Sequence, residues 1–100
     1  MFQMISIRQL EGLLNGERRF TLLDVREPEE YAVSHLDGAV NLPLSRLSQA
    51  PSILSRDRPV IIYCSHGSHS LLAARELSRQ GYRAYNVSGG LQYYRGRHLV

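Results

Sequence analysis

The only cysteine of the chain, Cys64, directly follows a short apolar run, Val60–Tyr63, and precedes a small polar loop. A thiol is nucleophilic only as a thiolate, and a helix N-terminus or a nearby cation favours that form. A helical pattern begins at about Ser70. Gly67 allows the loop to curl so that successive N–H groups face inward and form a concave anion site. These residues therefore predict a pocket that binds an anion and activates the Cys64 thiolate.

The side chains of this loop add hydrogen-bond donors to the predicted pocket. Its serines supply hydroxyl groups, and their small size leaves the pocket open to a substrate. We predict that Cys64 is the nucleophile and that the substrate is bound by the loop residues Ser65, His66, Gly67, Ser68, His69 and Ser70.

Two other interpretations of Cys64 remain open from the sequence. Free cysteine is often an inert buried residue. Alternatively, Cys64, His66 and His69 are three ligands of a metal ion, since zinc sites use Cys and His. The sequence has no second cluster of Cys or His that would complete a structural metal site. We therefore expect neither a metal nor a cofactor.

The composition is that of one ordinary globular domain spanning residues 1–100, of which 43% are hydrophobic. No apolar run approaches the roughly 18–20 residues that span a bilayer. The start of the chain lacks the basic and then apolar layout of a secretory signal. A single cysteine excludes an intrachain disulfide. We therefore expect a cytoplasmic protein that does not bind a membrane.

The formal net charge of +3 is unevenly distributed along the chain. All 12 basic residues are arginine, and residues 1–50 carry a net charge of −2 while residues 51–100 carry +5. An electropositive half that holds Cys64 favours an anionic substrate. The arginines are scattered and no basic run is interleaved with aromatic residues, so no nucleic-acid partner is predicted.

Strand and helix patterns alternate along the chain. Apolar or β-branched runs predict strands at residues 4–5, 20–25, 39–42, 60–63 and 82–87. Ser6 and Gln9 fit a capping box ahead of a helix that contains Ile7, Leu10 and Leu14. Further helices are predicted after Pro28, as one or two short pieces in 44–54, over 70–80 and over 91–95. The helix over 70–80 is expected to turn Leu71, Ala74 and Leu77 inward.

This alternation predicts a parallel sheet with helices on both faces. Ligands of such sheets sit beyond the carboxyl ends of the strands. Cys64 follows one strand, and Asp24 and Arg26 lie at the end of another, so both stretches are expected at the same edge. Arg26 is therefore a further candidate substrate-binding residue. The alternative is that Asp24 and Arg26 form a structural ion pair.

Five segments together resemble the single-domain rhodanese family of thiosulfate sulfurtransferases, over nearly the whole chain. Residues 22–31 resemble the first family signature, and residues 35–43 resemble the second, with Ser34 where a glycine is usual. Val60–Tyr63 and Cys64 match the catalytic strand and nucleophile, and residues 81–82 and 87–91 resemble the closing segments. The resemblance implies an α/β fold, a single rhodanese-like domain with about five mostly parallel strands flanked by helices on both faces.

The resemblance also implies a transferase that works in two steps. The Cys64 thiolate attacks the sulfane sulfur of a donor such as thiosulfate and releases sulfite. Backbone amides of residues 65–69 hold the Cys64 persulfide, and cyanide in the test tube or a thiol in the cell then takes the sulfur. The implied partners are a small anionic sulfur donor, thiosulfate or a persulfide, and a thiol or cyanide acceptor, with a sulfur-relay protein as a further candidate.

Two loop positions depart from the family pattern. Ser65 and His69 stand where the family commonly has arginine. Arginine can direct two donors at a sulfonate, whereas a neutral histidine offers one. The loop therefore favours persulfide chemistry over efficient use of thiosulfate. His66 and His69 would also make sulfur loading vary between about pH 5.5 and 8, and a flat profile would contradict that hypothesis.

Two other functions are weighed against this one. Cysteine phosphatases and arsenate reductases that share the fold use a loop one residue longer, which closes on an arginine. The loop from Cys64 to His69 is shorter and has no arginine, so this chemistry is not predicted. The second alternative is a module that carries sulfur on Cys64 for a partner, or serves only in docking, without turnover.

Overall fold

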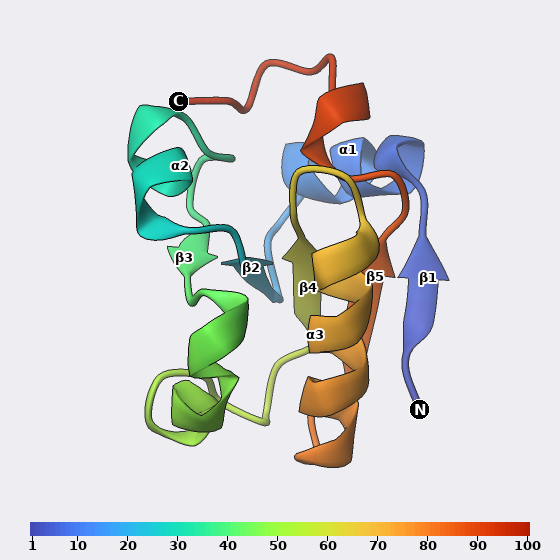
Figure 1. The fold of residues 1–100 in the computed structure, drawn as a ribbon. Coiled ribbons are helices and arrows are strands. Elements are labelled where there is room, and N and C mark those ends of the chain that lie inside the picture. The colour runs from blue at the N-terminus through green and yellow to red at the C-terminus, as the bar shows by residue number, and fades with distance from the viewer.

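The computed structural model describes residues 1–100 and contains one five-stranded sheet (Figure 1). The strand order is β1-β5-β4-β2-β3, and all neighbouring strands are parallel, which confirms the predicted fold class. The strands are β1 (Gln3–Ile5), β2 (Thr21–Asp24), β3 (Val40–Asn41), β4 (Val60–Tyr63) and β5 (Ala84–Val87). The strand before Cys64, β4, is therefore central and fully buried.

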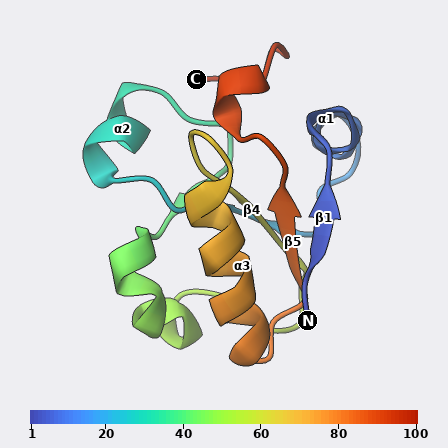
Figure 2. The ribbon, with the colours of Figure 1, turned by 45° about the vertical axis from the view of Figure 1, so that its right-hand side comes forward.

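Helices cover both faces of the sheet (Figure 2). Helix α3 (Ser68–Arg79) and the 3₁₀ segment η1 (Leu44–Ser52) pack on one face, where Ala73, Leu77 and Leu47 share one buried cluster with Ile62 of β4. Helix α1 (Ile7–Asn15) packs on the other. The remaining elements are α2 (Pro28–Val33) and the 3₁₀ turn η2 (Leu91–Tyr93). Burial on both faces explains why the strands read as continuous apolar runs.

The local signals that begin the helices act as expected. The Ser6 hydroxyl accepts a hydrogen bond from the Gln9 amide at 3.0 Å, and the Gln9 side chain accepts one from the Ser6 amide at 2.8 Å. Pro28 is the first residue of α2, where its missing N–H costs no helical hydrogen bond. No helix of the chain combines the length and apolarity that crossing a membrane requires.

Two details of the predicted helix after Cys64 are wrong. It begins at Ser68 rather than Ser70, because Gly67 has a φ of 96° and caps it in the left-handed conformation. Leu71 does not face inward and remains 40% exposed. The buried face instead consists of Ser70, Ala73, Ala74 and Leu77. Small side chains on this face let α3 approach the sheet closely, so the leucine beside them is turned outward.

Three of the five strands are shorter than the apolar runs that predicted them. The run at 82–87 forms a strand only from Ala84, because the Tyr82 amide donates to the Leu77 carbonyl at the end of α3 and not to a neighbouring strand. The strand predicted at 39–42 shrinks to Val40–Asn41 at the edge of the sheet. The shorter strands do not change the edge that matters for the site. The carboxyl ends of β2 and β4 lie side by side, with Asp24 opposite Tyr63.

Candidate active site

Cys64 directly follows the carboxyl end of β4, and α3 begins four residues later at Ser68. Its sulfur accepts hydrogen bonds from the backbone amides of Gly67 at 3.0 Å and Ser70 at 3.2 Å. The Ser70 hydroxyl lies 3.3 Å from the same sulfur. Two aligned N–H groups at a helix N-terminus stabilise a negative charge on sulfur. Although Cys64 is buried, its sulfur therefore contacts polar donors and not only apolar atoms.

The loop after Cys64 is fixed by the chain that follows β5. The Leu91 amide donates to the Cys64 carbonyl at 2.8 Å, and the Gln92 amide donates to the Ser65 carbonyl at 3.0 Å. These bonds direct both carbonyls toward η2. The amides of the loop residues Ser65, His66, Ser68 and His69 donate to no protein atom. They are therefore available to a bound anion.

Two glycines allow this contact between the loop and the segment that leads into η2. A β-carbon at Gly90, which has a φ of +71°, would lie 2.6 Å from the carbonyl oxygens of Cys64 and Ser65. A β-carbon at Gly67 would lie 2.9 Å from the Gly89 nitrogen. Gly90 therefore shapes the site, although it was not among the site residues predicted from the sequence. No local pattern reveals this contact, because 26 positions of sequence separate Gly90 from Cys64.

A cleft of about 230 Å³ opens over the sulfur. Six of the predicted site residues line it, and Gly67 and Ser70 instead hold the sulfur through their amides. The structure thus brings all the predicted site residues together at one edge of the sheet. The lining residues are Val25, Arg26, Glu27, Glu30, Cys64, Ser65, His66, Ser68 and His69.

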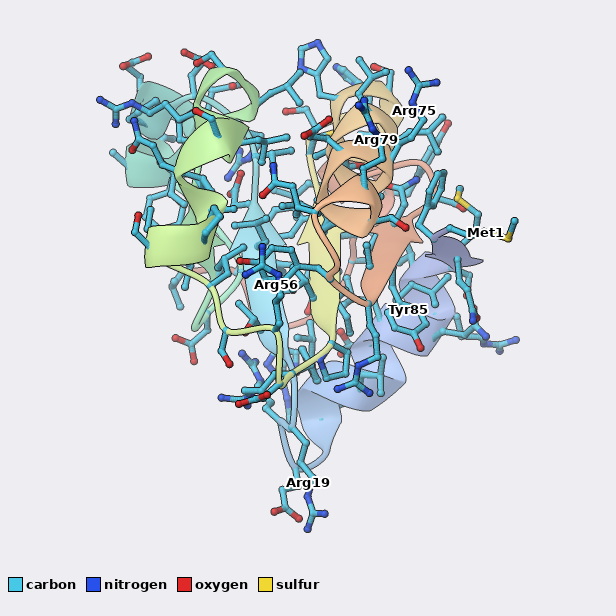
Figure 3. The ribbon with its side chains drawn as sticks, turned by 90° about the horizontal axis from the view of Figure 1, so that it is seen from below. Met1, Arg19, Arg56, Arg75, Arg79 and Tyr85 are labelled. Atoms are coloured by element: carbon cyan, nitrogen blue, oxygen red, sulfur yellow. The ribbon has the colours of Figure 1, made fainter.

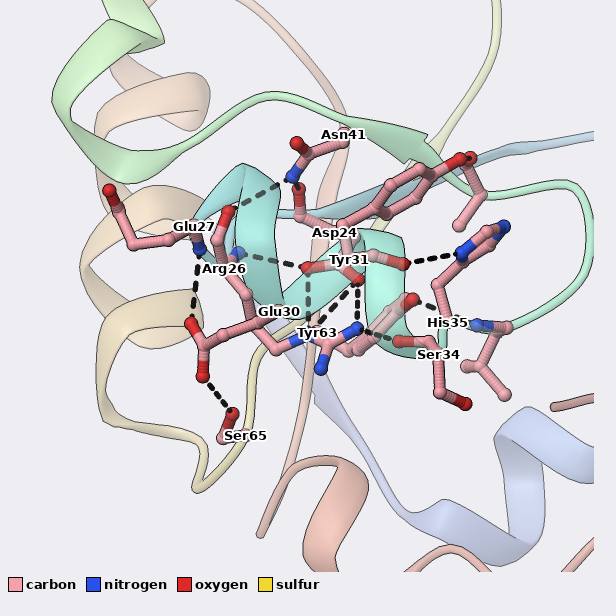
Figure 4. Close-up of polar contacts among 12 residues, drawn as sticks. Asp24, Arg26, Glu27, Glu30, Tyr31, Ser34, His35, Asn41, Tyr63 and Ser65 are labelled. Carbon is pink, nitrogen blue, oxygen red and sulfur yellow. Dashed lines mark hydrogen bonds and ion pairs between the residues drawn. The ribbon is translucent and has the colours of Figure 1, made fainter. Parts of the chain in front are cut away.

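Arg26 reaches this cleft while bound to Asp24 (Figure 4). Its Nε donates to both carboxylate oxygens at 3.1 Å, and its Nη2 donates to Asp24 Oδ2 at 2.7 Å and to the Ser34 carbonyl at 2.6 Å. Burial lowers the pKa of Arg26, but the hydrogen bonds and charge of Asp24 outweigh burial and raise it overall. The ion pair in the sequence analysis is therefore present, and Nη1 is the nitrogen that it leaves unbound.

Tyr63 connects this ion pair to the nucleophile, because it directly precedes Cys64. Its hydroxyl accepts a hydrogen bond from the Leu36 amide at 3.0 Å, and the Arg26 guanidinium lies 5.8 Å from the centre of its ring. Burial, followed by the charge of Asp24, raises the pKa of Tyr63 above its ordinary value. The phenol therefore stays neutral and helps to fix the end of β4.

Two acidic residues of the cleft, Glu27 and Glu30, were not among the site residues predicted from the sequence. The Glu27 amide donates to Glu30 Oε1 at 3.1 Å, and the Ser65 hydroxyl donates to Glu30 Oε2 at 3.4 Å (Figure 4). Neither carboxylate takes part in a salt bridge. Their position directly after β2, the neighbour of β4, was the signal that could have placed them near Cys64.

The excess arginines of residues 51–100 do not surround Cys64. Arg26 is the one arginine that lines the cleft, and it comes from the acidic half of the chain. Figure 3, which views the molecule from below relative to Figure 1, shows Arg56, Arg75 and Arg79 over the lower part of the molecule and along α3. The sequence analysis expected the positive charge of residues 51–100 to favour an anionic substrate. Because their arginines do not line the cleft, that charge gives no support for such a substrate.

The arrangement of side chains also bears on the metal alternative. No group of three or more His, Cys, Asp and Glu side chains is placed to hold a metal ion. Cys64, His66 and His69 thus do not form a ligand set. The chemistry of the cleft rests on the sulfur, the free amides and the charged side chains around them.

The fold and the position of the cysteine agree with a comparison against protein families. The model of the rhodanese-like domain matches residues 6–97. The chain therefore belongs to the rhodanese-like domain family.

Individual relatives support the same assignment. A tRNA sulfurtransferase of Desulfurococcus amylolyticus is 45% identical over 74 residues, which are 74% of this chain and 14% of that protein. The thiosulfate sulfurtransferase GlpE of Coxiella burnetii is 28% identical over 98% of this chain and 92% of its own. The crystal structure of a rhodanese-related protein from Thermoplasma volcanium is 30% identical with a TM-score of 0.83, and the match covers 98% of this chain and 97% of that one. The chain spans only a small part of the first of these relatives.

Proposed function

We propose that the protein is a sulfurtransferase that carries a sulfane sulfur on Cys64 between a donor, thiosulfate or a persulfide, and a thiol or cyanide acceptor. The observation that carries this proposal is the position of the Cys64 sulfur, which accepts hydrogen bonds from the amides of Gly67 and Ser70. Relatives named tRNA sulfurtransferase and thiosulfate sulfurtransferase give independent support for sulfur transfer.

In the first step the Cys64 thiolate attacks the sulfane sulfur of the donor. With thiosulfate, the new bond joins Cys64 Sγ to that sulfur, the bond to the sulfonate sulfur breaks, and sulfite leaves with the electron pair. In this proposal the amides of Gly67 and Ser70 stabilise the charge of the attacking thiolate.

The second step begins from the Cys64 persulfide. The outer sulfur carries negative charge, and the amides of Ser65, His66, Ser68 and His69, which have no protein acceptor, are suited to hold it. In this proposal Arg26 contributes its unbound Nη1, while Asp24 keeps the guanidinium in place. An acceptor thiolate or cyanide attacks the outer sulfur, and the Cys64 thiolate leaves.

The test is the intact mass of the protein after incubation with each donor. Wild type should gain one sulfur atom and lose it when cyanide is added, whereas Cys64→Ser should gain none. His69→Arg should improve thiosulfate kinetics by adding a forked donor. Absence of sulfur on wild type with every donor, or sulfur on Cys64→Ser, would refute the proposal.

A second candidate is a carrier that passes sulfur to a protein partner without turnover by itself. The tRNA sulfurtransferase relative favours this candidate. The segment that matches this chain makes up only 14% of that protein, so there the matching segment is one part of a longer chain. Steady production of thiocyanate from thiosulfate and cyanide identifies an enzyme. Stoichiometric loading without continued turnover identifies a carrier.

A further inference from the structure

The charged groups of the cleft favour one of the two donor classes named above. Arg26 is the one residue of the cleft with a permanent positive charge, and the fully buried Asp24 already balances it. Glu27 and Glu30 carry negative charges that no salt bridge compensates. The walls of the cleft are therefore more negative than an oxyanion site requires.

Glu30 is the carboxylate with the most direct relation to the reacting loop. Its Oε2 lies 3.4 Å from the hydroxyl of Ser65, the residue next to the nucleophile. Its Oε1 is held by the Glu27 amide, so the carboxylate cannot turn away without losing that bond. A donor that approaches the Cys64 sulfur thus meets a fixed negative charge as well as the loop amides.

We infer that Glu30 is a specificity-determining residue that selects uncharged or cationic persulfides as sulfur donors and disfavours dianionic thiosulfate. This inference rests on the proposed function. Thiosulfate brings two negative charges beside Glu30, whereas a persulfide R–S–SH can enter without charge at its reacting end. The step is Cys64–S⁻ + R–S–SH → Cys64–S–SH + R–S⁻, in which one S–S bond forms, one breaks, and the leaving thiolate takes the electron pair.

The test uses persulfides of similar size and different charge. They are the persulfides of cysteamine, 2-mercaptoethanol and 3-mercaptopropionate, whose reacting S–SH forms are cationic, neutral and anionic respectively, with thiosulfate as a fourth donor. The rate of loading of Cys64 is measured by intact mass for wild type and for Glu30→Gln. The ratio of the two rates for each donor cancels the intrinsic reactivity of that donor. Glutamine keeps the helix start, because it serves at this position of a capping box as glutamate does.

Glu29→Gln is the matched control, because Glu29 is exposed on the same turn of α2 and does not line the cleft. Glu30→Gln should raise loading by thiosulfate and by the anionic persulfide about fivefold, lower loading by the cationic one, and leave the neutral one unchanged. Equal effects on all donors, or an equal effect of Glu29→Gln, would overturn the inference. If no donor loads wild type, the proposed function itself fails.

Discussion

A β-carbon at Gly90 would lie 2.6 Å from the carbonyl oxygen of Cys64. The two residues meet because the Leu91 amide, next in the chain after Gly90, donates to that carbonyl at 2.8 Å. This backbone contact orients the first peptide of the loop and so determines where its free amides lie. The segment after β5 is thus part of the reactive site, although it supplies no side chain to the cleft.

Replacement of Gly90 by alanine should damage the loop without changing any polar group. A side chain at a φ of +71° is strained, and its β-carbon would clash with backbone rather than with a flexible side chain. We expect a loss of about 2 kcal/mol in the free energy of unfolding and at least a tenfold slower loading of Cys64. Urea unfolding and intact mass measure the two effects.

The control for this prediction is Gly12→Ala. Gly12 lies in α1, and a β-carbon there would meet nothing within 4 Å. Alanine should stabilise this helix by about 0.5–1 kcal/mol and leave loading unchanged. Loading of Gly90→Ala at the wild-type rate would show that the contact with η2 does not shape the site.

Ser70 should help the sulfur through its hydroxyl as well as its amide. The hydroxyl lies 3.3 Å from Cys64 Sγ and 3.2 Å from the Gly67 carbonyl, so its single proton can turn from that carbonyl to the sulfur once Cys64 is a thiolate. Ser70→Ala keeps both amide donors, so we expect loading to slow by about threefold to tenfold rather than to stop. Ser45→Ala, an exposed substitution on η1, is the control and should have no effect. An unchanged rate for Ser70→Ala would leave the two amides as the sole donors to the thiolate.

The Asp24–Arg26 pair should contribute far more to stability than a surface pair does. The side chain of Asp24 is fully buried and that of Arg26 is only 9% exposed. Asp24→Asn leaves a buried guanidinium without its counter-charge and should lower the free energy of unfolding by about 3 kcal/mol. Glu17→Gln breaks the exposed pair with Arg19 and should cost less than about 1 kcal/mol. Similar denaturant midpoints for the two variants would contradict this prediction.

The features that could be predicted from sequence are those that short segments determine. The strand β4 could be predicted because burial of both its faces leaves a continuous apolar run directly before Cys64. The start of α1 could be predicted because the Ser6–Gln9 capping box fixes it. The family signatures added the parallel topology, which local patterns support only indirectly. The site residues followed from one rule, that the carboxyl ends of parallel strands share an edge.

The features that could not be predicted depend on how distant segments pack. Leu71 and Ala73 both fit an apolar helix face, and only the close approach of α3 to the sheet selects alanine for the inside. Glu30 looks like an ordinary residue of a helix start until β2 is placed beside β4, which brings it to Ser65. The formal charge along the chain did not predict the charge around Cys64 for the same reason, because the arginines of residues 51–100 lie outside the cleft.

The buried phenol of Tyr63 predicts a loss of stability at alkaline pH. Burial raises the pKa of Tyr63, with the charge of Asp24 adding to the effect, whereas a tyrosine of the unfolded chain titrates near about 10. Below that pH both states are protonated and the contribution is constant. Above it the unfolded chain loses a proton that the folded chain keeps, so the free energy of unfolding should fall by about 1.4 kcal/mol per pH unit.

Denaturant unfolding between about pH 8 and 11.5 measures this slope. Tyr63→Phe should be less stable at neutral pH by about 1 kcal/mol, because the Leu36 amide loses its acceptor, but its alkaline slope should be smaller. Some slope should remain, since burial and then Glu11 raise the pKa of Tyr94 in the same direction. Tyr93→Phe, which changes an exposed side chain, should keep the wild-type slope. If Tyr63→Phe also keeps that slope, then the end of β4 does not hold a neutral phenol, and the argument that this phenol fixes the position of Cys64 is lost.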